Sequence, residues 1–427
     1  MNYKITNGQL LVYTEDGFKV EKKDLYIEGD KIAGIGACDP AKEDAYETVD
    51  ASDKLIMPGL INMHTHAYMT TMRNYADDVD FDEWLFKRVM PVEDRLPKEA
   101  AYWSSLLGCM EMIRTGTTAF VDMHMYCGQS PKAAQQAGMR AFIGRGLVGE
   151  DLYEDGYSRL KEALEEKEAY ESDLIRFVLS PHAIYSCSEK LYVQVAEEAN
   201  KRGMLKQTHL SESVAEVDNA VSKYGRTPVK LLSDLGFLDQ HTILAHCVQM
   251  RGDDMEILQR SGAHAVTNPA SNAKLGNGFA PVVEMDQKGI NLCIGTDGTA
   301  SNNTLNMFRE MGLLSLIHKG IHKDSTSAPA QFVLKAATVN AAKALGMEHQ
   351  TGVIETGACA DLNFVDLKAV SLFPNNNIVS SLCYSANGSE VDSVMIGGKF
   401  VMKNKEMLTI DTERVYYEMN KIINENL

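Results

Sequence analysis

Eight short apolar runs recur between residues 56 and 300, and helix-like amphipathic segments lie between them. The runs occupy residues 60–66, 118–124, 140–146, 175–182, 205–210, 242–247, 263–268 and 291–297. Apolar runs of this length are typical of strands buried on both faces, and several of the intervening segments end in glycine, as helix C-termini prefer. Eight strands that alternate with helices predict an α/β fold, a (β/α)8 TIM barrel over residues 56–351.

The two ends of the chain have a different pattern. Residues 1–55 and 352–410 alternate apolar and polar positions with turn residues between the runs, as in YKITNGQLLVYT and VDSVMIGGKFVMKN. This period of two predicts small antiparallel sheets. Because each end is too short to bury its own faces, we expect residues 1–55 and 352–427 to pack together as one β-sandwich domain beside the barrel.

The charge balance excludes several classes of partner. The 427 residues include 42 Lys and Arg against 59 Asp and Glu, a formal net charge of −17. Such an acidic surface repels phosphate backbones and anionic lipid, so we expect a small-molecule substrate and neither nucleic acid nor membrane. The eight cysteines form no CxxC pair and the sequence has no recognisable leader, which favours reduced thiols in the cytoplasm. Formation of a homo-oligomer stays open.

A candidate metal site begins with His64 and His66, two residues apart near the end of the first predicted strand. A period of two directs both imidazoles to one face, toward the barrel axis. Alone this pair is a weak signal, since two exposed or core histidines give the same pattern. Two later predicted strands end in His209 and Asp297. Because the C-terminal strand ends of such a barrel meet at one face, the four side chains predict a site for one divalent transition metal, with a position open for water.

Two further residues are candidates for the chemistry. His246 in LAHC ends the sixth predicted strand and is either a fifth ligand or, as we prefer, a residue that orients the water. Glu212 lies three residues beyond His209, where its carboxylate can reach that water or a substrate nitrogen; capping a helix is the alternative. A carboxylate such as Asp297 can bind the metal through one oxygen and take a proton through the other. Together these residues predict a generator of hydroxide at neutral pH.

Several motifs resemble those of one enzyme family. PGLINMHTHAYM, HLSE, AHC and GTDG are similar to motifs of the amidohydrolase superfamily. Within it, MRNYADD, MPVEDRL, EMIRTGTTAFVDM, SPHAIYSCS and NPASNAKLGNG resemble the 5'-methylthioadenosine/S-adenosylhomocysteine deaminases, and the resemblance covers nearly the whole chain. It implies metal-dependent hydrolytic deamination of adenine nucleosides substituted at the 5' position. Guanine or other purine deaminases and triazine-type amino- or chlorohydrolases share many of these motifs and are the alternatives.

The resemblance also implies roles for the site residues. It implies a mononuclear zinc site, formed by His64, His66, His209 and Asp297, and a hydroxide that attacks C6 of an adenine ring. In this scheme Asp297 accepts the water proton, Glu212 protonates ring N1 and assists the amine, and His246 steadies the tetrahedral centre. The fourth predicted strand ends in SPH with no lysine at its mouth, so we expect one ion per chain.

By the same resemblance, five residues match substrate contacts of the family. Glu93 in MPVED matches the residue that holds the ribose hydroxyls, and a carboxylate is a good acceptor for two hydroxyl protons. Arg145 in RGLV and His182 in SPHAIY match contacts at the third and fourth strand ends. Arg159 matches an arginine that reads the tail of larger substrates. Trp84 in DEWLF either walls the sulfur side of the nucleoside or packs a lid.

Three positions depart from the family pattern. Gln249 stands where a second histidine is usual after His246, and Asn74 stands where glycine is common. His124 ends the second predicted strand, where a structural role is preferred over a role in the pocket. These departures leave the implied reaction class intact. A noncatalytic scaffold is a further alternative, but it requires broken ligands, and none of the matched ligands is broken.

Overall fold

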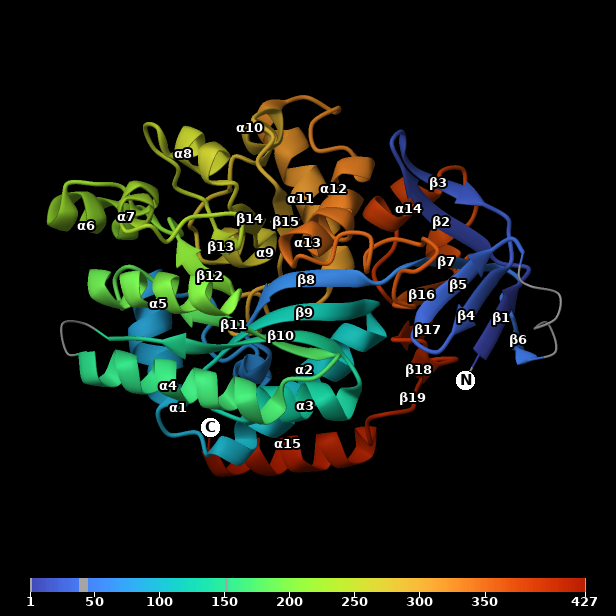
Figure 1. Cartoon of the computed structure of the whole chain (residues 1–427), viewed down its shortest axis with the longest axis horizontal. Coiled ribbons are helices and arrows are strands. Elements are labelled where there is room, and N and C mark those ends of the chain that lie inside the picture. The colour runs from blue at the N-terminus through green and yellow to red at the C-terminus, as the bar shows by residue number, and fades with distance from the viewer. Residues whose placement is uncertain (1, 38–44, 150–152, 427) are drawn as a thin grey trace.

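The computed structural model describes residues 2–37, 45–149 and 153–426, and its centre is an eight-stranded parallel sheet (Figure 1). The strands are β8 (Leu60–Thr65), β9 (Thr117–His124), β10 (Arg140–Leu147), β11 (Ile175–Pro181), β12 (Leu205–Leu210), β13 (Thr242–His246), β14 (His264–Thr267) and β15 (Leu292–Ile294). Consecutive strands pair in parallel throughout. The predicted barrel and its eight strands are confirmed.

The barrel closes between its last and first strands. The backbone amides of Thr296 and Asp297 donate to the carbonyl oxygen of His64, at 3.1 and 2.9 Å. This approach requires Gly295, because a Cβ at that position would lie 2.8 Å from the backbone nitrogen of His64. The closure therefore sets the end of the first strand directly beside the segment that carries Asp297.

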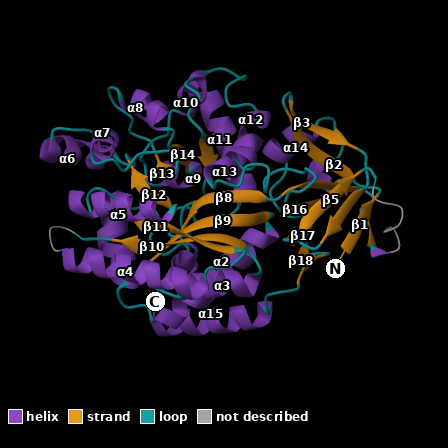
Figure 2. Cartoon of the chain, viewed as in Figure 1, coloured by secondary structure: helices purple, strands orange, loops and turns teal. Residues whose placement is uncertain are grey.

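Helices surround the barrel, as the purple ribbons in Figure 2 show. They are α2 (Lys98–Arg114), α3 (Gln129–Ala137), α4 (Tyr153–Tyr170), α5 (Glu189–Arg202), α6 (Val214–Tyr224), α7 (Pro228–Asp234), α8 (Asp254–Ser261), α9 (Pro269–Lys274), α10 (Val282–Gln287), α11 (Met307–His322), α12 (Ala330–Ala336) and α13 (Val339–Ala344). Between β8 and α2 the chain forms three short helices, η2 (Ala67–Met72), the π-helix η3 (Glu83–Val89) and α1 (Met90–Glu93). Ser188, Ser213 and Thr227 accept backbone amides and so begin α5, α6 and α7.

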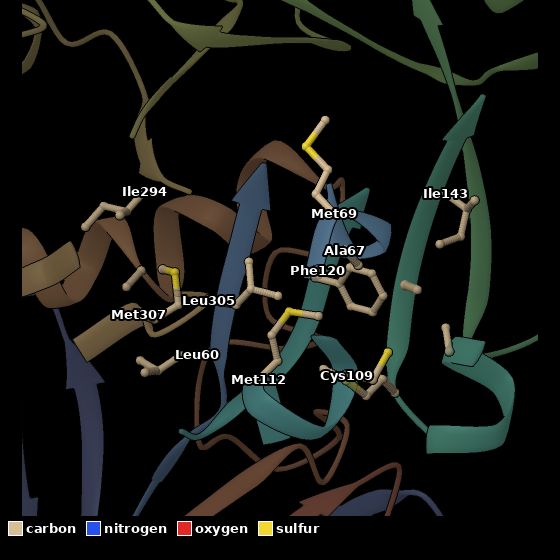
Figure 3. Packing of buried hydrophobic residues seen from close by; sticks show 14 of the residues in the cluster. Leu60, Ala67, Met69, Cys109, Met112, Phe120, Ile143, Ile294, Leu305 and Met307 are labelled. Atoms are coloured by element: carbon tan, nitrogen blue, oxygen red, sulfur yellow. The ribbon is translucent and has the colours of Figure 1, made fainter. Parts of the chain in front are cut away.

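The strands are held by an apolar core that they share with the helices. Every side chain of β8 and β9 is buried, as expected of strands covered on both faces. Figure 3 shows Phe120 of β9 near Met112 and Cys109 of α2, and Ile143 on the neighbouring strand. Full burial of one large apolar side chain contributes about 1.5–3 kcal/mol, so this core fixes the positions of the strand ends.

Strands from both ends of the chain form two further sheets, at the right of Figure 1. One contains β1 (Asn2–Thr6), β4 (Leu25–Glu28), β5 (Lys31–Ile35) and β6 (Glu47–Asp50). The other contains β2 (Gln9–Thr14), β3 (Gly17–Glu21), β7 (Lys54–Pro58), β16 (Leu362–Asp366), β17 (Val391–Ile396), β18 (Lys399–Lys403) and β19 (Glu406–Met407). One apolar cluster, with Ile5, Leu10 and Met395 among its members, joins the two sheets. That residues 1–55 and 352–427 form a separate domain stays a prediction.

The expectation of purely antiparallel pairing in these sheets is wrong. β1 pairs with β6 in parallel, and β2 pairs with β7 in parallel. Each pair is separated in the chain by other strands, so the chain re-enters the sheet in its original direction through a long crossover. The remaining pairs in the two sheets are antiparallel, as expected.

Two helices within residues 352–427 lie against the barrel helices. α14 (Ile378–Tyr384) contacts α11 and α12, and α15 (Thr412–Asn426), red in Figure 1, contacts α2. The buried face of α15 consists of Val415, Met419 and Ile422. The short helix η4 (Val370–Leu372) precedes α14. The C-terminal segment therefore contributes helices as well as strands.

A buried ion pair connects the barrel to the terminal sheets. Nε and Nη2 of Arg140, at the start of β10, lie 2.9 and 3.2 Å from the carboxylate of Asp361, next to β16. Asp361 also accepts from the Thr351 hydroxyl at 2.9 Å and from the Gly397 amide at 2.8 Å. Because every charge here is paired, removal of one partner would leave an uncompensated buried charge.

Two further findings concern membrane-spanning helices and cysteines. Within the described residues, no helix combines the length and the apolar character needed to cross a lipid bilayer. The cysteines of the same part of the chain are free thiols: Cys109, Cys127, Cys187, Cys247, Cys293, Cys359 and Cys383.

Candidate active site

Five titratable side chains from four strand ends meet at the C-terminal face of the barrel. They are His64 and His66 at the end of β8, His209 on β12, His246 on β13 and Asp297 after β15. The ligand atoms of His64, His66 and His209 lie within 4.8 Å of one another, and so do those of His64, His246 and Asp297. All five side chains are buried. The four predicted metal-binding residues and His246 thus come together in one place.

The backbone turns sharply at three of these strand ends. His246 has φ 75°, Asp297 has φ 62°, and Ser211, two residues after His209, has φ 50°. Residues other than glycine that adopt this left-handed conformation cost about 1–3 kcal/mol each and persist where the surrounding structure holds them. Such strained turns are concentrated at functional sites, and here they end the strands where the titratable side chains gather.

The histidine nitrogens are arranged for a cation. Nδ1 of His66 lies 2.7 Å from the carbonyl oxygen of Met123, and Nδ1 of His209 lies 2.8 Å from that of His182. Since a carbonyl only accepts, both Nδ1 atoms carry the proton and both Nε2 atoms present a lone pair. These two Nε2 atoms face each other at 3.2 Å, and neither ring nitrogen of buried His64 has a hydrogen-bond partner. The donor set fits a divalent metal ion.

The two carboxylate oxygens of Asp297 have different surroundings. Oδ2 accepts from the hydroxyls of Ser271 at 2.6 Å and Ser301 at 2.8 Å. Oδ1 lies 3.6 Å from Nε2 of His64 and 3.4 Å from Nε2 of His66. Burial raises the pKa of Asp297, but the adjacent histidines outweigh burial and hold this pKa well below its usual range. The carboxylate is therefore ionised, with Oδ1 turned toward the histidines.

The imidazoles of His64, His182 and His209 are neutral at pH 7. Burial is the main cause that lowers the pKa of His64 to about 4, that of His182 to about 3, and that of His209 well below its ordinary value. Nδ1 of His246 lies 2.9 Å from Oδ1 of Asn272 and 3.2 Å from Nδ2 of Asn268. Neutral imidazole is the form that binds a metal ion.

Glu212 lies just past β12, with Oε2 3.6 Å from Nε2 of His246. Its Oε1 accepts from the side-chain amide of Asn277 at 3.0 Å, and the carbonyl of Asn277 accepts from Gln249 at 2.6 Å. Burial raises the pKa of Glu212 well above its ordinary value, and the charge of Asp297 adds to this effect. A raised pKa favours the protonated form of the carboxyl group, which is the form that a general acid requires.

The capping role considered as the alternative for Glu212 belongs to its neighbour. The hydroxyl of Ser213 accepts from the amide of Glu216 at 3.1 Å and begins α6. The carboxylate of Glu216 in turn accepts from the amides of Ser211 and Glu212, at 3.1 and 2.7 Å. The side chain of Glu212 lines the cavity described next.

The cluster opens into a cavity of about 740 Å³, measured with its open mouth. Its apolar lining comes largely from the segment after η2 and includes Phe81, Trp84, Leu85, Phe86 and Met90. The indole Nε1–H of Trp84 donates to the carbonyl oxygen of Ala300 at 3.1 Å, which fixes the ring as one wall. A cavity that joins titratable groups on one side to an apolar wall on the other suits a small organic ligand.

Glu93, at the end of α1, also lines this cavity. Its Oε1 accepts from the hydroxyl of Tyr68, and its backbone carbonyl accepts from the hydroxyl of Tyr126. Burial is the main cause that raises the pKa of Glu93, and the hydrogen bond from Tyr68 opposes that rise. Tyr68 therefore holds the half-buried carboxylate of Glu93 at the wall of the cavity, and Tyr126 holds its backbone.

The other predicted substrate contacts divide into two groups. His182 lines the cavity, with its ring centroid 4.7 Å from that of His209. Arg145 and Arg159 are not among the residues that line it in the described part of the chain. The guanidinium of Arg145 binds the Met125 carbonyl and lies 2.9 Å from the carboxylate of Glu162.

The structure also shows the surroundings of the three residues that depart from the family pattern. Nε2 of His124 lies 3.0 Å from the carboxylate of Glu166 in a fully buried pair, in keeping with a structural role. Gln249 stands behind Asn277, which contacts Glu212. Asn74 donates to the carboxylate of Asp77 at 3.1 Å on the surface.

Some residues of the site were not predicted from the sequence. They are Tyr68, which holds Glu93, the serines 271 and 301, which hold Asp297, and the asparagines 272 and 277, which hold His246 and Glu212. The motifs HAYM and NPASNAKLGNG contain four of these residues, so the resemblance of the motifs was a sequence signal for them. Their partners depend on loop geometry, which the motifs alone do not give.

Comparison with known proteins identifies the family. The Amidohydrolase family model matches residues 55–401 of the chain. The chain belongs to the amidohydrolase family. This amidohydrolase is 42% identical over 425 residues to a 5-methylthioadenosine/S-adenosylhomocysteine deaminase of Caldanaerobacter subterraneus subsp. tengcongensis, covering 99% of this chain and 98% of that protein. It is 39% identical over 424 residues to a 5'-deoxyadenosine deaminase of Methanosarcina mazei, covering 99% and 97%.

A solved structure resembles this amidohydrolase over its full length. It is the crystal structure of an adenosine deaminase from Xanthomonas campestris with bound zinc, which superposes with a TM-score of 0.92 at 29% sequence identity. The match covers 99% of this chain and 98% of that chain. Family membership and the donor set together support a divalent metal at the histidine cluster.

Proposed function

We propose that this amidohydrolase removes the 6-amino group of adenine nucleosides that carry a substituted 5' carbon, giving the inosine analogue and ammonia. One observation carries the proposal. A single cavity holds the histidine–carboxylate cluster, the half-buried carboxylate of Glu93 and an apolar wall. The relatives named above, which are 39–42% identical over nearly the whole chain, support the same reaction by their names.

One zinc ion is held, in this proposal, by His64, His66, His209 and Asp297. Three imidazoles and one carboxylate are ligands that suit zinc. Nε2 of His66 and Nε2 of His209 face each other at 3.2 Å, and their lone pairs support a cation there. When bound, such an ion supplies Lewis acidity and brings the pKa of a coordinated water near 7. His246 is assigned to orient that water, since its Nε2 lies 3.6 Å from Glu212.

The residues of the chain move the protons. Asp297 accepts a proton from water, with Oδ1 turned toward His64 and His66 and Oδ2 held by two serine hydroxyls. Glu212, whose raised pKa keeps it protonated, donates to ring N1 of the adenine and then assists departure of ammonia. His246 steadies the developing oxyanion at C6. The two carboxyl groups have pKa values shifted in opposite directions, as an acid and a base at one site require.

The nucleoside is positioned by the walls of the cavity. Glu93 accepts the two ribose hydroxyls, a geometry that suits a carboxylate with two oxygens. Trp84 lies along the side of the nucleoside, and His182, held by the hydroxyl of Ser186 at 2.8 Å, contacts the base. This arrangement leaves the apolar residues of η3 and α1 for the 5' substituent.

An ammonia-release screen tests the proposal. The zinc-loaded protein is offered 5'-substituted adenosines, adenosine, guanine and an aminotriazine in parallel. We expect release from the 5'-substituted adenosines and little from the free base or the triazine. Turnover of guanine or the triazine alone would establish one of the two alternative reactions instead.

Glu93→Ala provides a matched variant for that screen. Because free bases and triazines have no ribose, loss of Glu93 weakens only nucleoside turnover under the proposal. We expect kcat/KM for nucleosides to fall by at least about 100-fold, the cost of a lost bidentate contact. Unchanged nucleoside turnover in this variant would contradict the role of Glu93.

A further inference from the structure

One segment of the chain, residues 268–278, contacts all three groups that carry the proposed proton transfers. It comprises α9 and the turn that follows this helix. The contacts between side chains of the segment and groups of the site are Ser271 with Asp297, Asn272 with His246, and Asn277 with Glu212. The placement of this segment therefore affects the geometry of the reaction.

The turn after α9 has little conformational preference of its own. Asn277 stands between Gly276, with φ 69°, and Gly278, with φ 99°. Glycine adopts such angles readily because it has no Cβ, but for the same reason it restricts the backbone least. The position of Asn277 therefore depends on the contacts that its backbone makes with other parts of the chain.

The backbone of Asn277 is held on both sides. Its amide donates to the carbonyl oxygen of Asn272 at 3.0 Å, and its carbonyl oxygen accepts from Nε2 of Gln249 at 2.6 Å. A Cβ at Gly278 would lie 3.6 Å from the same Nε2, so the turn packs directly on the Gln249 side chain. Because a carbonyl only accepts, the nitrogen of the Gln249 amide must face Asn277.

Gln249 is in turn tied to the chain just before Glu212. The backbone amides of Gln249 and Val248 donate to the carbonyl oxygen of Ser211, at 2.8 and 3.1 Å. Ser211 directly precedes Glu212, whose Oε1 accepts from the side chain of Asn277 at 3.0 Å. The hydrogen bonds thus form a closed circuit that begins and ends at the segment carrying the proposed proton donor.

This circuit distinguishes the two oxygens of the Glu212 carboxyl group. The carbonyl oxygen of a protonated carboxyl group is its better acceptor, so the hydrogen bond at Oε1 favours a proton on Oε2. Oε2 lies 3.6 Å from Nε2 of His246, and both Glu212 and His246 line the cavity. Gln249 and Asn277 are not among the lining residues in the described part of the chain. Any effect of these two residues on the reaction must therefore pass through Glu212.

We infer that Gln249 is a positioning residue for the deamination: through the backbone of Asn277 it holds the amide that binds Oε1 of Glu212, so that Oε2 and its proton face the substrate ring. The inference rests on the proposed function and deepens it. Proton transfer requires the donor within hydrogen-bond reach of the acceptor, and a displacement of about 1 Å costs about 100-fold in rate. Because Glu93 and not Glu212 is assigned to the ribose, the role predicts an effect on kcat with little effect on KM.

Gln249→Met tests the role with Gln240→Met as its matched control. Methionine keeps the length of the side chain and removes the donor. Gln240 is an exposed glutamine just before β13, whereas Gln249 follows the same strand. With 5'-methylthioadenosine we expect kcat of Gln249→Met to fall about 3- to 10-fold, the effect of one lost hydrogen bond, and KM to stay within about twofold. Gln240→Met should match the unaltered enzyme. An unchanged kcat in Gln249→Met would overturn the inference.

A double-mutant cycle separates positioning from a general effect on the fold. In Glu212→Gln the carboxyl group is absent, so the contact made by Gln249 no longer orients a proton donor. We expect Gln249→Met to leave the residual kcat of Glu212→Gln unchanged within about twofold. The same loss of kcat in both backgrounds would mean that Gln249 acts elsewhere, and it would overturn the inference.

Asn277→Ala provides a second variant that does not alter Gln249. It removes the donor to Oε1 of Glu212 and keeps the backbone carbonyl that Gln249 binds. We expect kcat to fall by about fivefold or more, with KM again within about twofold. Unaltered kcat in Asn277→Ala would overturn the inference even where Gln249→Met does not fold.

The unaltered zinc-loaded enzyme separates this inference from the proposed function. Absence of ammonia release from every nucleoside offered to it would overturn the proposed function, and the inference with it. An active unaltered enzyme whose kcat is kept in full by both Gln249→Met and Asn277→Ala would overturn the inference alone.

Discussion

The hydroxyl of Ser271 donates to Oδ2 of Asp297 at 2.6 Å. Ser301 donates to the same oxygen at 2.8 Å, whereas Oδ1 accepts from the Gly298 amide at 2.8 Å and faces the histidines. The two serines thus hold Oδ2, while Oδ1 lies 3.6 Å and 3.4 Å from Nε2 of His64 and His66. The carboxylate of Asp297 is thus held in position through Oδ2, while Oδ1 faces the histidines.

Ser271→Ala should slow turnover without removing the metal. Loss of a hydrogen bond to a charged group costs about 1.5–3 kcal/mol, so we expect kcat to fall by about 10- to 100-fold. Ser301 still holds Oδ2 and the histidines are untouched, so the bound metal should be unchanged when measured by elemental analysis. Ser261→Ala, on α8, is the control. An unaltered kcat in Ser271→Ala would refute the positioning role.

Glu212→Gln should keep the metal and lose the reaction. The glutamine keeps the shape of the side chain and its contact with Asn277, but it cannot transfer a proton. We expect kcat to fall by at least about 100-fold, the usual contribution of general acid–base catalysis. Metal content and melting temperature serve as the controls. Full activity in this variant would eliminate Glu212 as the proton donor.

Tyr68→Phe should weaken nucleoside binding more than catalysis. The variant removes the hydroxyl that donates to Glu93, so the half-buried carboxylate loses a fixed partner. We expect KM for 5'-deoxyadenosine to rise by about tenfold with kcat nearly constant, and KM for its 2',3'-dideoxy analogue to stay unchanged. A rise in KM of equal size for both nucleosides would mean that Tyr68 acts on the fold and not on Glu93.

Glu310→Gln should flatten the dependence of stability on pH. Burial raises the pKa of Glu310 to about 7 in the folded chain, although the Ala270 amide and the Asn302 side chain donate to it. The folded carboxyl thus binds its proton more tightly than the unfolded one, so it stabilises the fold below about pH 4.5 and loses that contribution as pH rises toward about 7. At about 1.4 kcal/mol per pKa unit, the loss is roughly 3 kcal/mol.

Urea unfolding at several pH values checks this prediction. The free energy of unfolding of the unaltered chain, minus that of Glu310→Gln, should decrease between about pH 4.5 and about pH 7. A difference that is constant over this range would mean that Glu310 does not change its protonation there.

The barrel was predictable because its strands are buried on both faces. Runs such as TAFVDMH are apolar over nearly their whole length, and the structure places them at residues 117–124 within one residue of the prediction. His64 and His66 could be paired from the sequence because the strand period is two. Parallel strands of one barrel end at one face, so the sequence could also place His209, His246 and Asp297 beside these two histidines.

Other features depended on contacts that no local pattern encodes. The parallel pairs β1 with β6 and β2 with β7 arise from crossovers, whereas period two alone does not distinguish parallel from antiparallel pairing. Helix α15 did have a local signal, in Val415, Met419 and Ile422 at helical spacing, but no element was predicted beyond residue 410. The hydrogen-bond partners of Arg145 lie in two other segments of the chain. The direction of its side chain could therefore not be predicted from the local sequence.

Titration of the metal-free protein with zinc, followed by ammonia release from 5'-methylthioadenosine, tests most directly whether one ion at the histidine cluster supports the reaction. We expect no activity without zinc, a linear rise on addition, and a break at about one zinc ion per chain. Full activity in the metal-free protein, or a break at two ions per chain, would contradict the account.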